Sequence, residues 1–255
     1  MKALLIMFIL VLVFVQKACA QLSIINDPDG FVNVREGKSL KAKIIGKLFD
    51  GEIFLCDDEN SKDEWLWVAF DSNNFKTFNS EPQKKFQSVE NETNAFVHRS
   101  RIVHLYSLPQ PRLTKTWSLN HSALILANDS IKLNISRSAF VAKNHYINFG
   151  KAGCPGCPAI VDKIDGKTPI GEDGGMPTFK IQYVGLKVNG IDIKFPADSY
   201  NDLYQPKLNN FSVHYDNKGN IYLLMPANSD GAGSYDVVWV VNHHKLVARY
   251  FDSID

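Results

Sequence analysis

Short segments with apolar side chains at alternate positions recur along this chain. They are rich in β-branched and aromatic residues, and Gly, Asn, Asp and Pro separate them, a pattern typical of strands joined by turns. An apolar period of 3.6 is not sustained over ten residues, and only 158–164 and 196–203 have the character of short helices. We therefore predict an all-β protein with strands at 52–56, 65–70, 122–127, 179–187, 191–195, 220–225, 235–241 and 246–251.

Three turn signals punctuate these segments. Asn189-Gly190 lies between two predicted strands and is the strongest, because a type I′ hairpin turn needs positive φ at both central residues. Residues 216–220 and 242–245 are the other two. The sequence therefore predicts antiparallel hairpins in its second half.

Composition places the chain among ordinary globular proteins. Its 255 residues are 45% hydrophobic and 22% charged, which excludes a disordered or multi-span membrane chain. The 28 basic side chains nearly balance the 27 acidic ones, so we expect no nucleic-acid partner. This length suits one large domain or two small ones.

The N-terminus has the character of a secretory signal. Lys2 precedes an unbroken apolar run at 3–15, and the small-residue triplet Ala18-Cys19-Ala20 follows. The run is too short to span a bilayer and fits the apolar region of a signal peptide. We predict that residues 1–20 form this signal peptide and that cleavage leaves Gln21 first.

A lipid anchor on Cys19 is the alternative interpretation of the same segment. A lipobox needs an aliphatic residue three positions before the cysteine, and here that residue is Gln16. No later segment is long and apolar enough to span a membrane. The expected location is therefore periplasmic or extracellular, without a membrane span.

The predicted mature chain has three cysteines, Cys56, Cys154 and Cys157. An odd number allows at most one internal disulfide, so a disulfide framework does not hold this fold together.

Cys154-Pro155-Gly156-Cys157 is the sharpest chemical motif. A C-x-x-C between a strand-like segment and a short helical segment is the context of a thiol oxidoreductase, and in such a fold Pro177 would face the pair. Only 23 residues separate Cys154 from Pro177, too few for the strand and helix that a thioredoxin fold places between them. A disulfide within the loop, or an idle thiol pair, is the preferred interpretation. A zinc site would lack two ligands.

Four segments of the first half form a recognisable series: DPDGFVNVREGKS at 27–39, GKLFDGEIF at 46–54, WLWV at 65–68 and FVHRSRI at 96–102. In this order they resemble the bacterial SH3-like domain. The resemblance covers about residues 22–108, except that 71–94 are inserted where the family has a short turn. It implies a small β-barrel at 21–108 that binds cell-wall peptides or proteins.

The chain changes character near Pro109 and Pro111. Beyond them, DGGMP at 173–177 and NSDGAGSYDVVW at 228–239 resemble C-terminal parts of secreted bacterial SH3-like proteins. This resemblance implies a second domain without implying an activity for it. We expect an antiparallel β-sandwich or another β-rich domain of unknown function at 109–255.

The candidate ligand-binding residues are Trp65 and Trp67. On a strand both lie on one face, opposite Leu66 and Val68, and a small barrel buries only one face. Aromatic side chains anchor peptides and glycans. The simpler alternative is that Trp65 packs in the core and Trp67 covers the inserted loop.

The sequence contains none of the common catalytic motifs. It has no G-x-S-x-G, no H-E-x-x-H and no phosphate-binding loop, and no cysteine is placed like that of a Cys-His wall hydrolase. We therefore assign no catalytic residue, no metal ligand and no cofactor.

The prediction is an exported, non-catalytic binding protein of the cell envelope that recognises a peptide, a glycan or a protein. An immunity-type inhibitor of a toxin is one form of it. The alternatives are a thiol-disulfide oxidoreductase using Cys154 and Cys157, or a cell-wall hydrolase.

Overall fold

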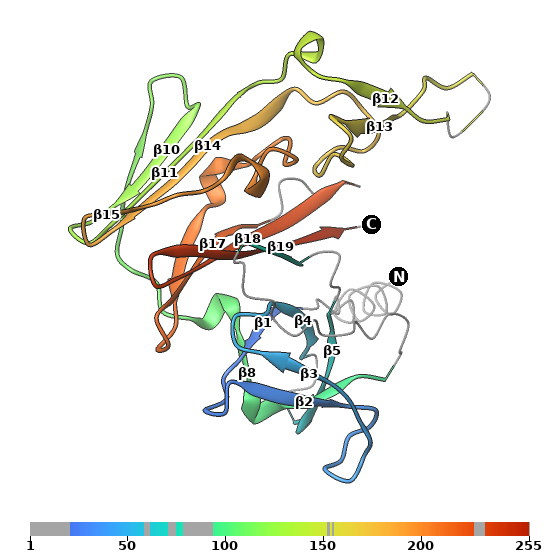
Figure 1. Ribbon diagram of the computed structural model, residues 1–255, viewed down its shortest axis with the longest axis vertical. Coiled ribbons are helices and arrows are strands. Elements are labelled where there is room, and N and C mark those ends of the chain that lie inside the picture. The colour runs from blue at the N-terminus through green and yellow to red at the C-terminus, as the bar shows by residue number, and fades with distance from the viewer. Residues whose placement is uncertain are drawn as a thin grey trace, which may run out of the picture. The chain divides into compact units, whose positions relative to one another are not determined.

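The computed structural model divides the chain into two compact units. The first comprises residues 1–71 and 86–107, and the second comprises 72–85 and 108–255. Every regular element in the described residues is a β-strand or a single 3-10 turn, which confirms the all-β prediction (Figure 1). The predicted signal peptide and most of the predicted insertion lie outside those residues. The structure describes residues 21–58, 62–70, 75–78, 94–151, 154, 156–226 and 233–254.

The first unit is built on one antiparallel sheet in the order β3-β2-β7-β5-β4-β1-β8. The SH3-like character of this sheet stays a prediction. Its strands are β1 (Gln21–Ile25), β2 (Phe31–Arg35), β3 (Ile44–Phe49), β4 (Phe54–Asp57), β5 (Trp65–Ala69), β7 (Phe96–His98) and β8 (Ile102–His104).

Alternation along β5 decides which side chains fill the core of this unit. Leu66 and Val68 are buried, whereas Trp65 and Trp67 are half-buried on the opposite face. Successive side chains of a strand point to opposite faces, so one set must leave the core. Both tryptophans therefore lie outside the set that packs with Val97.

Within its described residues, the second unit forms two five-stranded antiparallel sheets and one two-stranded sheet. The first five-stranded sheet has the order β15-β14-β11-β10-β9, and the second has the order β16-β17-β18-β19-β6. The strands of the first are β9 (Thr114–Trp117), β10 (Ala123–Ala127), β11 (Ile131–Ala139), β14 (Phe179–Val188) and β15 (Ile191–Ile193). The strands of the second are β6 (Phe75–Thr77), β16 (Ser212–Tyr215), β17 (Asn220–Met225), β18 (Ser234–Asn242) and β19 (Lys245–Ile254). The two-stranded sheet consists of β12 (Ile147–Phe149) and β13 (Val161–Ile164).

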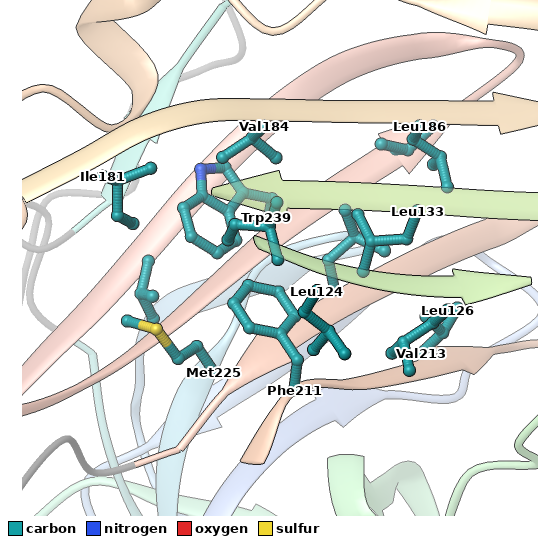
Figure 2. Close-up of a cluster of buried hydrophobic side chains, with 14 of the residues drawn as sticks. Leu124, Leu126, Leu133, Ile181, Val184, Leu186, Phe211, Val213, Met225 and Trp239 are labelled. Carbon is teal, nitrogen blue, oxygen red and sulfur yellow. The ribbon is translucent and has the colours of Figure 1, made fainter. Parts of the chain in front are cut away.

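The two five-stranded sheets share one hydrophobic core and so form a β-sandwich. Leu133 and Val184 from one sheet belong to the same buried cluster as Met225 and Trp239 from the other (Figure 2). Trp239 is fully buried, and its indole N–H donates to the carbonyl oxygen of Ser199 at 2.8 Å. Buried apolar faces of two sheets thus hold this unit together.

The predicted hairpin turn at Asn189-Gly190 is confirmed. It joins β14 to β15, and its φ angles are 49° and 82°. His243 and His244 form the β18–β19 turn with φ of 46° and 60°, so the same backbone shape occurs there without glycine.

The two expected short helices are wrong. Residues Val161–Ile164 form strand β13, and Ala197–Ser199 form only one 3-10 turn. A helix of two turns is marginal by itself because its nucleus is costly, whereas pairing with β12 supplies ladder hydrogen bonds at once.

Part of the segment predicted as an insertion belongs to the second unit. β6 pairs antiparallel with β19, with Lys76 opposite Arg249. The amide of Phe78 extends this pairing by donating to the carbonyl oxygen of Val247 at 3.0 Å. The C-terminal sandwich therefore includes a strand from before residue 108.

Candidate ligand-binding site

A cleft of about 820 Å³ opens in the second unit. Strand β6, residues 167–173 and the side chains of Arg249 and Phe251 on β19 line it. Ligand pockets are usually concave sites of roughly 300–1,000 Å³ with a few convergent polar groups, so this cleft has the dimensions of one.

A buried ion pair underlies the cleft. Arg249 is only 3% exposed, and its Nη1 and Nη2 donate to Oδ1 and Oδ2 of Asp202 at 2.5 Å and 2.9 Å. Nη1 also donates to the carbonyl oxygen of Ser199 at 3.2 Å. Two parallel bonds fix the guanidinium plane, so the pair forms a rigid floor.

Glu172 brings an unsatisfied acceptor to the cleft. Its Oε1 is buried and accepts no hydrogen bond from any described residue. Burial raises the pKa of this carboxyl group, although a hydrogen bond with Gln205 opposes that rise. Native structures rarely leave such atoms unpaired, so the carboxylate is suited to a donor from outside the chain.

Two glycines determine the path of the backbone around Glu172. Gly171 has a φ of 102°, and a Cβ there would overlap the carbonyl oxygen of Tyr204 and the ring of Tyr235. A Cβ on Gly233 would lie 2.7 Å from the carbonyl carbon of Glu172. Only glycine lets these segments approach so closely, which is why the glutamate lies at the cleft.

The lysines of the cleft are held by neighbouring oxygen atoms. Lys76 Nζ lies 2.8 Å from both the backbone oxygen and Oδ2 of Asp198, and Lys167 Nζ donates to Asn201 Oδ1 at 2.8 Å. The cleft thus combines positioned ammonium groups with the carboxylate of Glu172. Such a mixture suits a ligand that has both N–H donors and carbonyl acceptors, as a peptide backbone does.

The tryptophans predicted from the sequence do not line this cleft. They lie on β5 of the first unit, where the Trp65 ring meets the His98 ring edge-on at a centroid distance of 5.3 Å. Trp67 is half-buried on the same face.

Cys154 and Cys157 form a disulfide in the loop between β12 and β13, and both are exposed. In the described part of this loop no helix follows Cys157, and the next element is β13. The helix N-terminus that lowers a thiol pKa in redox motifs is therefore not found there.

Cys56 is buried in the first unit. Burial, reinforced by the nearby charges of Asp58 and Asp57, raises its pKa to about 12. The thiolate is the reactive form of cysteine, so Cys56 is a poor nucleophile near neutral pH.

A Ser-His-Asp arrangement that sequence reasoning missed lies in the first unit. His104 Nδ1 is 2.9 Å from Ser23 Oγ, and its Nε2 is 2.9 Å from Asp58 Oδ2. Burial disfavours ionisation of Asp58, but hydrogen bonds from Arg99 and His104 outweigh it and lower its pKa. These residues have the composition of a catalytic triad. They are far apart in the sequence, so no local motif indicated them.

The environment of Ser23 favours a structural role for this network. The side chain is fully buried, and its hydroxyl donates to the carbonyl oxygen of Gln21 at 3.0 Å. A nucleophile must reach its substrate and pass its proton to the imidazole. The network instead ties β1 to β8 and to the residue after β4.

The described residues contain no group of three or more His, Cys, Asp or Glu side chains that could hold a metal ion. The same residues include no helix long and apolar enough to cross a membrane. The chain matches no family model, no curated protein and no solved structure in our comparisons.

Proposed function

We propose that this is an exported, non-catalytic binding protein whose C-terminal sandwich receives a peptide segment of a partner in the cleft beside β6. The single observation that carries the proposal is the buried Oε1 of Glu172, which accepts no hydrogen bond from the described chain. An amide N–H or a basic side chain of the partner would satisfy it.

The sheet edge beside the cleft favours a peptide. Among the described strands β6 is the last of its sheet and pairs with β19, and all three of its residues line the cleft. An extended peptide can add to such an edge through main-chain hydrogen bonds, while side-chain pockets supply specificity. Glu172 would then select peptides with a donor group at the matching position.

The first unit supports the same proposal through its resemblance to bacterial SH3-like domains, which implies recognition of cell-wall peptides or proteins. Trp65 and Trp67 are half-buried on one face of β5 and offer a second contact surface. A partner in the periplasm or outside the cell agrees with the signal-like segment at 1–20.

The enzymatic alternatives have weaker support. A thiol oxidoreductase needs a thiol of lowered pKa, and the described residues show no helix after Cys157 that would lower it. A Cys-dependent wall hydrolase needs a reactive cysteine, whereas the pKa of buried Cys56 is raised to about 12.

The test uses the protein comprising residues 21–255 as bait to select binders from a displayed library of random nonapeptides. We expect selected peptides to lose affinity by about tenfold or more for Glu172→Lys, because the substitution replaces an acceptor with a cation. Asp162→Lys on exposed β13 is the matched control and should bind like the unaltered protein. Peptides that bind Glu172→Lys equally well, or a selection that enriches none, would exclude this cleft as a peptide site.

A further inference from the structure

A second, smaller pocket of about 370 Å³ lies elsewhere on the C-terminal sandwich. Trp117 at the end of β9, His121 in the following turn and Arg137 on β11 line it together with residues 205–209. None of these residues lines the cleft around Glu172. We call it the Trp117 pocket.

Positive charge gathers here without a carboxylate among the lining residues. The Arg137 guanidinium lies 4.5 Å from the centroid of the Phe179 ring and forms no ion pair with any described residue. Lys207 is exposed and likewise forms no ion pair with any described residue. At the rim, Lys115 Nζ lies 5.4 Å from the Trp117 ring centroid and donates to the carbonyl oxygen of Asn209 at 2.6 Å.

The turn that borders the pocket is held by its own side chains. Asn120 Oδ1 accepts from the hydroxyl groups of Ser118 at 2.9 Å and Ser122 at 2.7 Å, and Ser118 Oγ accepts from the amide of Ala123 at 3.0 Å. The turn also presents Leu119, whose side chain is fully exposed. A prearranged surface loses little conformational entropy on binding, so this turn is suited to a ligand.

Three planar groups meet at this pocket. The Trp117 and His121 rings lie 5.5 Å apart between centroids, and the Arg137 guanidinium supplies the third plane. Planar groups pack against the C–H face of a sugar ring, and cations bind a carboxylate or sulfate on it. An acidic peptide side chain would neutralise the cations but would leave these planar faces without a partner.

We propose that the Trp117 pocket binds an acidic saccharide, with its carboxylate or sulfate on Arg137 and Lys207 and its ring against Trp117. This site is separate from the proposed peptide cleft. Different residues line the two sites, although Gln205 of the Trp117 pocket hydrogen-bonds to Glu172 of the cleft.

The test is calorimetric titration of residues 21–255 with a trisaccharide of galacturonic acid. We expect binding that weakens with added salt, and little or no binding of the neutral galactose trisaccharide. Affinity should fall about tenfold in Arg137→Gln and in Lys207→Gln, since each removes a charge-assisted hydrogen bond. Lys163→Gln removes an equal charge from exposed β13 and should leave affinity unchanged.

Two measurements show whether a loss of affinity comes from this pocket rather than from misfolding or from the peptide cleft. Arg137→Lys keeps the positive charge beside Phe179, and Lys207→Gln alters an exposed side chain, so thermal unfolding should be nearly unchanged in both. Lys76→Gln changes a residue that lines the peptide cleft and not this pocket, and it should bind the trisaccharide normally. The proposal is overturned if the neutral sugar binds equally well, if triglutamate binds more tightly, if Lys163→Gln loses as much affinity, or if millimolar galacturonate trisaccharide gives no heat.

Discussion

Arg249 and Asp202 form a two-point ion pair, 47 residues apart in sequence, in which the guanidinium is almost completely buried. The pair joins strand β19 of the second sheet to the segment after the 3-10 turn at Ala197–Ser199. A charge buried in this way depends on its partner for most of its solvation.

Removing the carboxylate should therefore be costly. We expect Asp202→Ala to lower the free energy of unfolding by about 3–5 kcal/mol, because Arg249 then stays buried without its counter-ion. Urea unfolding followed by circular dichroism measures this. Asp192→Ala removes the exposed partner of Lys187 and should cost less than about 1 kcal/mol, so equal losses in both variants would contradict the assigned role.

Glu52 should make the stability of the first unit depend on pH. It is 4% exposed, and burial raises its pKa to about 7, while the amide of Phe49 donates to its Oε2 at 2.8 Å and opposes that rise. The folded state holds the proton more tightly than the unfolded state, so stability falls as the pH rises from about 4.5 to 7. This shift corresponds to about 3 kcal/mol.

Glu52→Gln should remove this pH-dependent contribution to the free energy of unfolding. We expect the variant to be more stable than the unaltered protein at pH 8 and to show a smaller loss of stability between pH 4.5 and 8. Chemical unfolding across this pH range measures the difference, and Glu36→Gln on the exposed surface serves as the control. A variant whose pH dependence equals that of the unaltered protein would refute the raised pKa.

Replacing Cys154 and Cys157 with serine distinguishes a binding protein from an oxidoreductase. The disulfide spans a sequence separation of three, so it restricts the unfolded chain little, and its loss should cost about 2 kcal/mol or less. Binding of the selected peptides should persist. Insulin reduction by the unaltered protein that disappears in the double variant would establish the redox alternative instead.

We predict that the protein is exported and that its mature form begins at Gln21. The prediction follows from the apolar run at 3–15 and from Ala18-Cys19-Ala20, which have the order of a signal peptide and its cleavage site. The intact mass of the protein recovered from its host decides this. A lipid-modified Cys19 at the N-terminus, or retention of residues 1–20, would show that the proposed route is wrong.

The local sequence was sufficient to predict strands and turns whose residues strongly favour one backbone conformation. The strand predicted at 220–225 coincides with β17, and Asn189-Gly190 forms its turn because few other residue pairs adopt positive φ so readily. Strand β11 at Ile131–Ala139 was not predicted, although Ile131, Leu133 and Ile135 alternate there with polar side chains. The alternation ends after Ser136, and the strand continues to Ala139 because it pairs with β14, which is a tertiary property.

The all-β class and the two sets of side chains on β5 can be predicted from residue patterns alone, because alternation follows from strand geometry. That Leu66 and Val68 face the core is a result of tertiary packing, since either face of an isolated strand can be buried. Tertiary packing also forms the cleft, where Lys76, Glu172 and Arg249 meet from distant parts of the chain. Such a site comes from long-range sheet pairing and packing, which no local pattern of residues encodes.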